Sequence, residues 1–164
     1  MLFLLIVLTV VIVCFTQVIY TVPNGYEYII ERAGSFHSIQ TAGIRIKLPF
    51  IDQIKKKVFI EDRNMHFDKT PIISADNHTL QITIDAYFKV IDSYLFCYTS
   101  DNALTAFEFL VITAARNVLG NYQMNEILEQ QNKITHEILN ITKEAAINFG
   151  IQTDLVSLEI FNVN

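Results

Sequence analysis

The sequence has few of the residues that build disulfide-stabilised or nucleic-acid-binding proteins. It contains two cysteines. Cys14 lies in an apolar N-terminal run and Cys97 in the middle of the chain, so they cannot form a disulfide framework. Lys and Arg number 12 against 17 Asp and Glu, for a net charge of −5 and a pI near 5.3. Nucleic-acid-binding proteins usually carry a basic face, so we expect no nucleic-acid partner.

Motifs for catalysis and metal binding are also missing. The four histidines form neither an H-E-x-x-H pair nor a Cys/His metal spacing, and no G-x-S-x-G elbow or G-x-x-x-x-G-K loop is present. Asp76-Asn77-His78 could be an acid/base group, but Asp-Asn before a strand more often forms a turn by bonding its own backbone. We therefore expect no enzyme activity, no catalytic residues, no metal and no cofactor.

Charge is absent from the start of the chain, where Leu2–Ile19 is almost entirely apolar and Glu27 is the first charged side chain. About 18 helical residues reach ~27 Å, just enough to cross a hydrocarbon core of ~30 Å. A cleaved signal peptide is the alternative, but no basic residue precedes Arg32 and no small-x-small cleavage site is visible. We expect residues 1–20 to be an uncleaved transmembrane anchor and residues 21–164 to be one folded domain.

The charges around this anchor indicate an orientation. The α-amine is the only charge before it, whereas Arg32, Arg45 and Lys47 follow it. Because basic residues favour the cytoplasmic side, we expect a single-pass protein of the cell membrane with a cytoplasmic domain.

Strand patterns fill the first half of the domain. β-branched, aromatic or alternating residues predict strands at Tyr26–Arg32, Ile44–Leu48 and Gln53–Glu61, which would form a small antiparallel sheet near the bilayer. The longest strand is expected at Thr79–Val90. Its core-facing residues are Leu80, Ile82, Ile84, Ala86 and Phe88.

Helical patterns follow. Asp101 or Asn102 can cap a buried helix that runs to Leu119. A second helix is expected from Met124 to Phe149, ended by Gly150. Its apolar stripe comprises Met124, Ile127, Leu128, Ile134, Ile138, Ile141, Ala145 and Phe149. A final strand at Ile151–Val163 completes an α+β fold, because strands and helices do not alternate as βαβ units.

Short motifs along the whole chain carry a resemblance to a known family. They are Val22-Pro23-x-Gly25, Glu31-Arg32-x-Gly34, x-Gly43 before Leu48-Pro49-Phe50-Ile51-Asp52, Ile73-Ser74-x-Asp76-Asn77, and Leu119-Gly120 before Asn125-Glu126-Ile127-Leu128. The chain resembles the SPFH or Band 7 family of stomatins, prohibitins and flotillins, and is most similar to bacterial stomatin-like proteins.

The resemblance implies an N-terminal membrane anchor followed by an SPFH (prohibitin-homology) domain. It also implies a scaffold that self-associates, organises membrane microdomains and holds partner membrane proteins, often proteases. A small regulatory adaptor of a membrane-bound protease is the alternative. The family's C-terminal coiled coil does not follow the last strand, Ala42 replaces a common proline, and Gln131 replaces a common basic residue. We therefore expect weaker self-association, either in a naturally short member or in a fragment.

Two surfaces are candidates for contacts with partners. Basic and apolar residues early in the domain could face lipid headgroups. The alternatives are an ordinary solvated hairpin for the basic residues and buried loop packing for Phe50 and Ile51. These membrane-interface candidates are Arg45, Lys47, Phe50, Ile51, Lys55, Lys56 and Lys57. Charged residues of the second helix could contact a neighbouring copy, although such a face is usually solvated. These self-association candidates are Glu129, Lys133 and Glu137.

Overall fold

The computed structural model describes residues 18–162. Most of the expected anchor, residues 1–17, lies outside this range, and its last two residues belong to strand β1 (Ile19–Val22). The expected boundary between residues 20 and 21 therefore falls inside a strand. Between residues 18 and 162, no helix is long and apolar enough to cross a membrane. The chain divides into an N-terminal unit that ends at Glu61 and a C-terminal unit that begins at Asp62.

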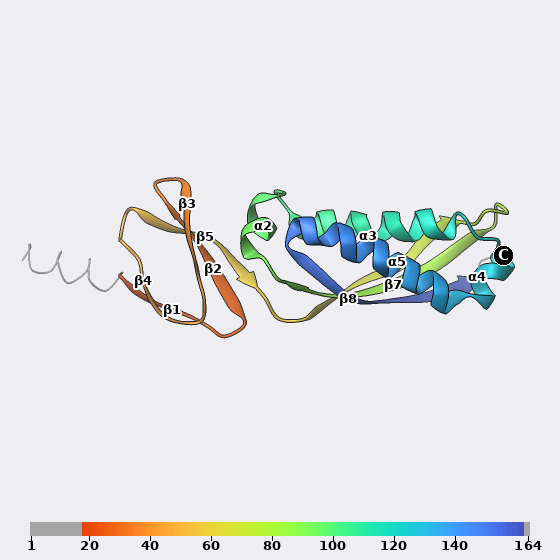
Figure 1. The fold of residues 1–164 in the computed structure, drawn as a ribbon, viewed down its shortest axis with the longest axis horizontal. Coiled ribbons are helices and arrows are strands. Elements are labelled where there is room, and N and C mark those ends of the chain that lie inside the picture. Colours follow the sequence, from red (N-terminus) through yellow and green to blue (C-terminus); the bar gives the residue numbers. More distant parts are fainter. Residues whose placement is uncertain (1–17, 163–164) are drawn as a thin grey trace, which may run out of the picture. The chain divides into compact units, whose positions relative to one another are not determined.

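The N-terminal unit is built from five strands (Figure 1). Strand β1 pairs antiparallel with β4 (Gly43–Ile46) as a two-stranded ribbon. The other three form an antiparallel sheet with the order β3-β2-β5. Their bounds are β2 (Tyr26–Arg32), β3 (Ser35–Gln40) and β5 (Asp52–Phe59).

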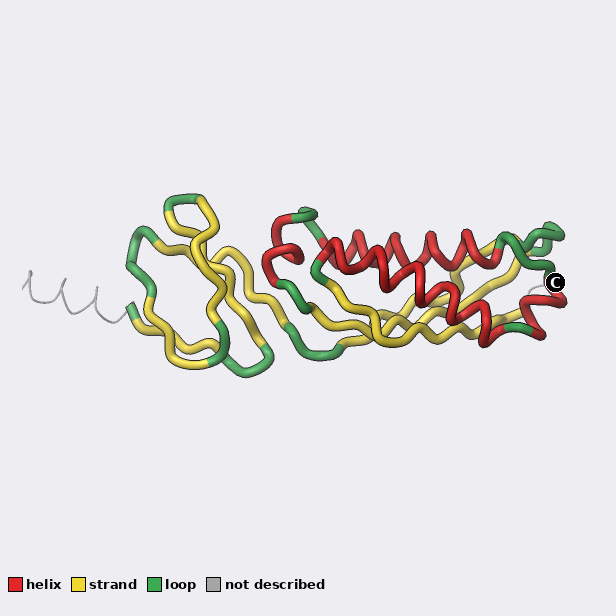
Figure 2. Tube along the Cα trace, in the orientation of Figure 1, coloured by secondary structure: helices red, strands yellow, loops and turns green. Residues whose placement is uncertain are grey.

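The C-terminal unit is a three-stranded antiparallel sheet with helices over one face (Figures 1 and 2). Its strands, in spatial order, are β6 (Arg63–Ile73), β7 (Thr79–Val90) and β8 (Ile151–Asn162). The long helices are α3 (Ala103–Leu119) and α5 (Gln131–Ala146), which pack on each other, and α5 also packs on β8. Shorter helices are α2 (Ser93–Tyr98), α4 (Met124–Glu129) and the 3₁₀ turn η1 (Ile147–Phe149).

The core of the C-terminal unit confirms the expected inner face of β7. All five expected residues, from Leu80 to Phe88, are buried. Phe107 of α3 is fully buried and its ring lies 4.7 Å from that of Phe88. Asn102 caps α3 by accepting a hydrogen bond from the Thr105 N–H. The α+β class and the antiparallel pairing are therefore confirmed.

The expected helix from Met124 to Phe149 is wrong as a single element. Gln130 leaves the helical conformation, with φ −112° and ψ 25°, and separates α4 from α5. The buried residues of α5 are Ile134, Ile138, Thr142 and Ala146, four apart. Ile141 and Leu128, expected in the apolar stripe, are exposed. The sequence gives no proline or glycine signal at this break.

Four elements were not predicted, namely β1, β3, β6 and α2. Strand β6 contains Pro71 and a register shift between Phe67 and Thr70, which together disrupt the alternation that identifies a strand. Strand β3 is short and contains two serines. Strand β1 continues the apolar N-terminal run, so its sequence pattern could not be separated from that of the anchor.

Candidate functional site

One face of the β1–β4 ribbon carries apolar side chains that point to solvent. Ile19 lies opposite Ile46, and Thr21 lies opposite Ile44. Because alternate residues of a strand share a face, the three isoleucines lie on the same side. Ile44 is 75% exposed, Ile46 68% and Ile19 61%. We call these three residues the apolar ribbon face.

The other face of the ribbon is packed against its own unit. Tyr20 and Val22 of β1 contact a buried cluster that includes Tyr28 and Ile30 of β2. The rings of Tyr20 and Tyr28 are stacked, with centroids 6.1 Å apart. A strand cannot turn over without exchanging all of its side chains between the two faces. The isoleucines are therefore held outward by the burial of their neighbours.

The loop after β4 presents a second apolar group. Phe50 is 88% exposed and has a φ of 69°, a left-handed conformation that is uncommon for a bulky residue. Ile51 beside it is also exposed. The loop is closed at its base, where the Asp52 N–H donates to the Leu48 carbonyl (3.0 Å) and the Leu48 N–H donates to Asp52 Oδ2 (2.8 Å). The expected residues Phe50 and Ile51 are thus held in a defined, solvent-facing loop.

Asp52 connects this loop to the central strand of the sheet. Arg32 Nε donates to Asp52 Oδ1 (2.7 Å) and Arg32 Nη2 donates to Oδ2 (3.1 Å), a bidentate ion pair. The hydrogen bonds from Arg32 and from the Leu48 N–H lower the pKa of Asp52 to about 2, and the bond to Asp52 raises the pKa of Arg32. The carboxylate is therefore charged at physiological pH and ties the loop to β2.

Arg45 and Lys47 do not lie on the apolar ribbon face. Arg45 pairs with Tyr20 across the ribbon, on the side opposite the isoleucines. Its guanidinium donates to the Thr41 carbonyl (2.9 Å) and to the Thr41 hydroxyl. Lys47 follows in the same alternation and is half-buried. The alternation of apolar and basic residues was identified from the sequence, but the apolar residues, not the basic ones, form the more exposed face.

The three lysines of β5 do not share one face. Lys57 lies opposite Tyr28 with its Nζ 5.1 Å from the ring centroid, whereas Lys56 lies opposite Ile29, the next residue of β2. Neighbouring residues of a strand point to opposite faces. Lys55 Nζ lies 3.5 Å from Glu31 Oε1. The backbone of β5 therefore directs Lys56 and Lys57 to opposite faces of the sheet.

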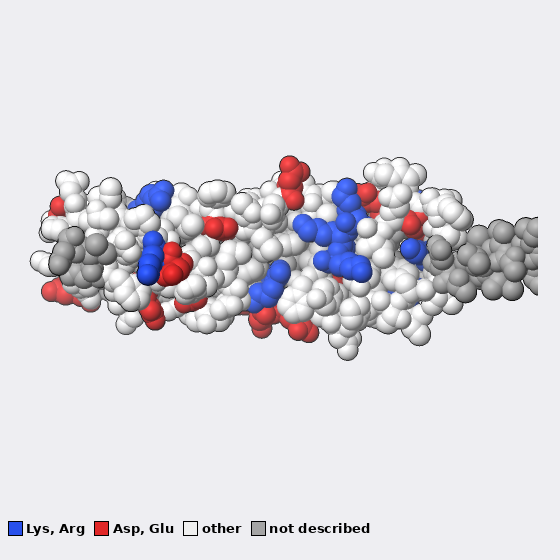
Figure 3. All heavy atoms as spheres, turned by 180° about the vertical axis from the view of Figure 1, so that it is seen from behind, with Lys and Arg blue, Asp and Glu red and all other residues white. Residues whose placement is uncertain are grey.

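The N-terminal unit is nevertheless the basic part of the chain. Residues 18–61 contain six Lys and Arg against four Asp and Glu, a net charge of +2, and residues 62–164 contain six against thirteen, a net charge of −7. Together these account for the chain's −5. Figure 3 shows Lys and Arg side chains gathered over one face of the N-terminal unit.

The self-association candidates lie at the junction of α4 and α5. Glu129 is the last residue of α4, and Lys133 and Glu137 lie one turn apart on α5. All three are exposed. Glu137 Oε2 accepts a hydrogen bond from the Tyr122 hydroxyl (3.0 Å), and Lys133 Nζ lies 5.7 Å from the Tyr122 ring centroid. Two of them therefore already bind within their own chain, and their role between copies stays a prediction.

Asp76, Asn77 and His78 form the expected turn. The Asn77 N–H donates to the Ser74 carbonyl (3.0 Å), and Asn77 has a φ of 62°. The Asp76 carboxylate accepts from the Ser74 hydroxyl and from the Met124 N–H at the start of α4. These bonds lower the pKa of Asp76. Among residues 18–162, no group of His, Cys, Asp and Glu could hold a metal ion.

Comparison with known proteins agrees with this architecture. The sequence matches the SPFH domain / Band 7 family over residues 20–164. The chain belongs to the Band 7 family. The matched range begins inside β1, so it includes all the strands and helices described above except the first residue of β1, Ile19.

Curated relatives of this Band 7 chain come from bacteria, fungi and animals. It is 28% identical over 137 residues to an uncharacterized protein of Mycobacterium tuberculosis, with 84% of this chain and 36% of that protein covered. It is 26% identical over 135 residues to human "Stomatin-like protein 2, mitochondrial", with 82% and 38% covered. An uncharacterized protein of Schizosaccharomyces pombe is 28% identical over 131 residues, with 80% and 37% covered. The chain thus spans just over a third of the length of these relatives.

Sequence reasoning missed the three isoleucines of the apolar ribbon face. A signal was present, because Ile44 and Ile46 alternate with basic residues as a strand with two different faces would. Which face is outward depends on the pairing of β4 with β1, and the first two residues of β1 were assigned to the anchor.

Proposed function

We propose that this protein is a membrane-anchored scaffold with no catalytic role. The apolar run that precedes the described residues crosses the membrane once. The apolar ribbon face and the Phe50 loop lie in the lipid interface beside it. Copies gathered in this way organise membrane microdomains and partner membrane proteins, with the folded domain on the cytoplasmic side.

The apolar ribbon face is the observation that carries this proposal. Three isoleucines, two of them more than two-thirds exposed, directly follow the apolar run in β1 or pair with β1. Clustered exposed apolar residues commonly mark sites that bind a membrane or another protein. Full burial of one such side chain contributes roughly 1.5–3 kcal/mol. The net charge of +2 on residues 18–61 adds attraction to an anionic leaflet, at about 1 kcal/mol for each basic residue near the surface.

A tryptophan at position 50 tests this contact with lipid. The chain contains no Trp, so Phe50→Trp introduces a unique fluorophore at the most exposed large apolar side chain among the described residues. The full chain is reconstituted in vesicles that contain phosphatidylglycerol and shallow brominated lipid. We expect blue-shifted emission and strong quenching. A matched control, Phe109→Trp on an exposed position of α3, should keep water-like emission.

The apolar ribbon face is tested in the same background. Ile44→Asp together with Ile46→Asp should reduce the quenching of Trp at position 50, because charged side chains resist transfer out of water. Both residues are exposed, so these changes should not unfold the unit. Water-like emission of Trp at position 50 in the otherwise unchanged chain would refute membrane contact.

Self-association is the second part of the proposal. Anchors confine all copies to one plane, which raises their effective concentration without new contacts. Chemical cross-linking in membranes followed by sizing should give a ladder of oligomers. The double change Lys133→Glu with Glu137→Lys tests whether copies contact each other through the α4–α5 junction. A single small complex in place of a ladder would instead favour an adaptor. Any version without the N-terminal run must keep β1, because Tyr20 and Val22 pack in the core.

A further inference from the structure

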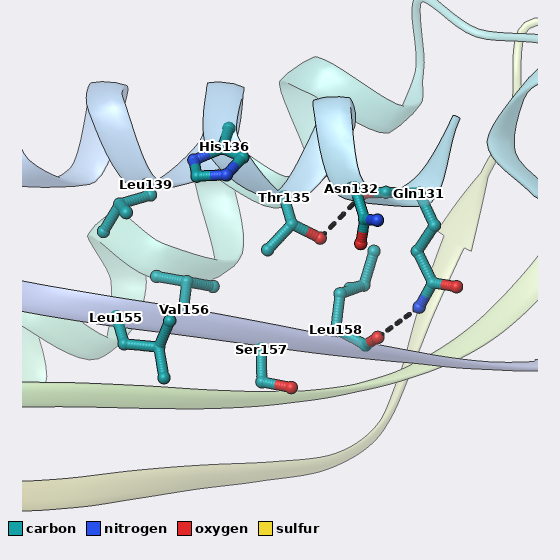
Figure 4. A pocket seen from close by; sticks show the side chains of 9 residues that line it. All are labelled: Gln131, Asn132, Thr135, His136, Leu139, Leu155, Val156, Ser157 and Leu158. Atoms are coloured by element: carbon teal, nitrogen blue, oxygen red, sulfur yellow. Dashed lines mark hydrogen bonds between the residues drawn. The ribbon is translucent and has the colours of Figure 1, made fainter.

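A groove runs between α5 and β8 in the C-terminal unit (Figure 4). It has a volume of about 400 Å³. Residues of α5 from Gln131 to Leu139 line one side, and residues of β8 from Leu155 to Leu158 line the other. In Figure 4, Gln131 and Thr135 point from the helix toward β8, and Val156 points from β8 toward the helix.

Strand β8 is an edge strand, since the sheet order is β6-β7-β8. It stays in register with β7 without interruption from Leu155 to Asn162. Its backbone groups on the side away from β7 are a template for another strand. The opposite edge is different, because β6 contains Pro71, which has no N–H, and a register shift before Thr70. Such features disfavour pairing at an edge. Of the two edges, β8 is the one suited to accept a strand.

The contact between Gln131 and Leu158 shows that the groove accepts an amide donor. The Gln131 side-chain amide donates to the Leu158 carbonyl, so this carbonyl is directed toward the groove. In an antiparallel strand the N–H and C=O of one residue point to the same side, and residues two apart repeat this direction. The N–H and C=O groups of Val156 and Ile160 therefore point the same way. Gln131 occupies a hydrogen-bonding position that the backbone N–H of an added strand would otherwise take.

The dimensions of the layers leave room for one more strand. Packed helices lie ~10 Å apart and paired strands ~4.8 Å apart, so two helices cover about four strands. This sheet has three. Helix α3 packs toward β6 and α5 toward β8, so the uncovered space beneath α5 is at the edge of β8. The part of β8 that lines the groove, from residue 155 to 158, is ~10 Å long, which is the length of three or four residues of an extended segment.

We propose that this groove binds an extended segment of a partner protein, which adds to β8 as a fourth strand. The lining residues include no Asp, Glu, Lys or Arg, and His136 is their one titratable side chain. A charged side chain of the bound segment would therefore meet no fixed charge of opposite sign in the groove. The bound segment is therefore uncharged over three or four residues and has apolar side chains at alternate positions, which contact the half-buried Leu139. This inference does not depend on membrane attachment.

A peptide display experiment tests the proposal on the full chain in lipid nanodiscs. A library of random peptides of ~10 residues is selected against the unchanged protein, and the selected peptides are synthesised. We expect uncharged, alternating sequences that slow amide hydrogen exchange at Val156 and Leu158. Methylating the backbone nitrogens along one edge of a peptide should abolish binding, and methylating those along the other edge should not, because only one edge of an added strand faces β8.

Two groove variants and one matched control locate the site. Leu139→Glu should weaken peptide binding at least ~10-fold by placing a carboxylate in the groove. Asn132→Arg, at an exposed lining position, is a second variant in case the first disturbs folding. Ile141→Glu changes an exposed residue of the same helix outside the groove and should leave binding unchanged.

Three results would overturn the proposal. One is that every selected peptide still binds to at least one of the two groove variants. Another is that binding ignores backbone methylation on both edges, which would indicate side-chain recognition alone. The third is a concentration-dependent dimer that the groove variants disrupt and no peptide displaces, which would assign the groove to a second copy of this chain.

Discussion

Asp52→Asn is the most informative single change in the N-terminal unit. The carboxylate accepts from Arg32 through both oxygens and from the Leu48 N–H through Oδ2. An amide offers one acceptor oxygen and one NH₂ group. The amide at position 52 therefore cannot accept from both Arg32 and the Leu48 N–H, and one of these donors loses its acceptor.

The magnitude follows from the exposure of the two partners. The Asp52 side chain is 4% exposed but the Arg32 side chain is 39% exposed, so solvent replaces part of the lost interaction. A hydrogen bond to a charged group contributes about 1.5–3 kcal/mol. We expect Asp52→Asn to reduce the free energy of unfolding of the N-terminal unit by about 2 kcal/mol at pH 7, and to loosen the loop that presents Phe50.

The pH dependence has a defined sign. The pKa of Asp52 is lowered to about 2 in the folded state, against ~3.9 in an unfolded chain. Its contribution is therefore present above pH ~4 and is lost as the pH falls from ~4 through about 2. The difference in stability between the unchanged protein and Asp52→Asn should narrow over this range.

Urea unfolding followed by the fluorescence of Trp at position 50 measures this difference, with Phe50→Trp as the common background. The neutral control is Gln53→Asn, an exposed neighbour on β5. Equal midpoints and slopes for Asp52→Asn and its parent at pH 7 would refute the reasoning, as would a difference that does not change with acid.

Three further predictions concern the C-terminal unit. Gly150→Ala should destabilise the protein by about 3 kcal/mol or more in a thermal melt, because Gly150 has a φ of 70° and an added Cβ would lie 2.1 Å from the Asp92 carbonyl oxygen; an unchanged melting temperature would contradict this. Thr142→Val should stabilise it by about 1 kcal/mol, since the buried Thr142 hydroxyl has no hydrogen-bond partner among the described residues, whereas Thr142→Ser should not. Asp85→Asn should lower the pKa of His66 in an NMR titration, because the hydrogen bond to Asp85 (2.8 Å) raises it. The stability that the His66–Asp85 contact contributes is present below the ordinary His pKa of ~6.5 and is lost as the pH rises through the raised pKa of His66. If His66 has the same pKa in both proteins, the Asp85 contact is not the cause of the raised pKa.

Sequence patterns were most informative where one face of an element is buried. Strand β7 was predicted with its observed bounds and inner face, because alternation with Ile82 and Ile84 on one side persists over twelve residues. Helix α3 was predicted for the same reason, with Asp101 or Asn102 as its cap, and Asn102 is the one that caps it. Strand β6 was missed because its bulge interrupts the alternation. The break at Gln130 was missed because both flanking segments are good helix formers.

Contact of the candidate interface residues with lipid stays a prediction. Phe50 and Ile51 were identified as candidate interface residues, and both are exposed. The lysines of β5 were treated as one group, because adjacent basic residues in a sequence suggest a cluster. A strand places neighbours on opposite faces, so Lys56 and Lys57 are divided between them.

The amino-acid sequence by itself determined the α+β class, the family, the apolar N-terminal run and the absence of catalytic motifs, because each follows from composition, local periodicity or short motifs. The tertiary structure decided which face of the β1–β4 ribbon is exposed, how Asp52 closes the Phe50 loop, and that β8 is an edge strand beside a groove. These features depend on pairing between segments far apart in the chain. Ile19 and Ile46 become neighbours only when β1 pairs with β4, and no local pattern specifies that partner.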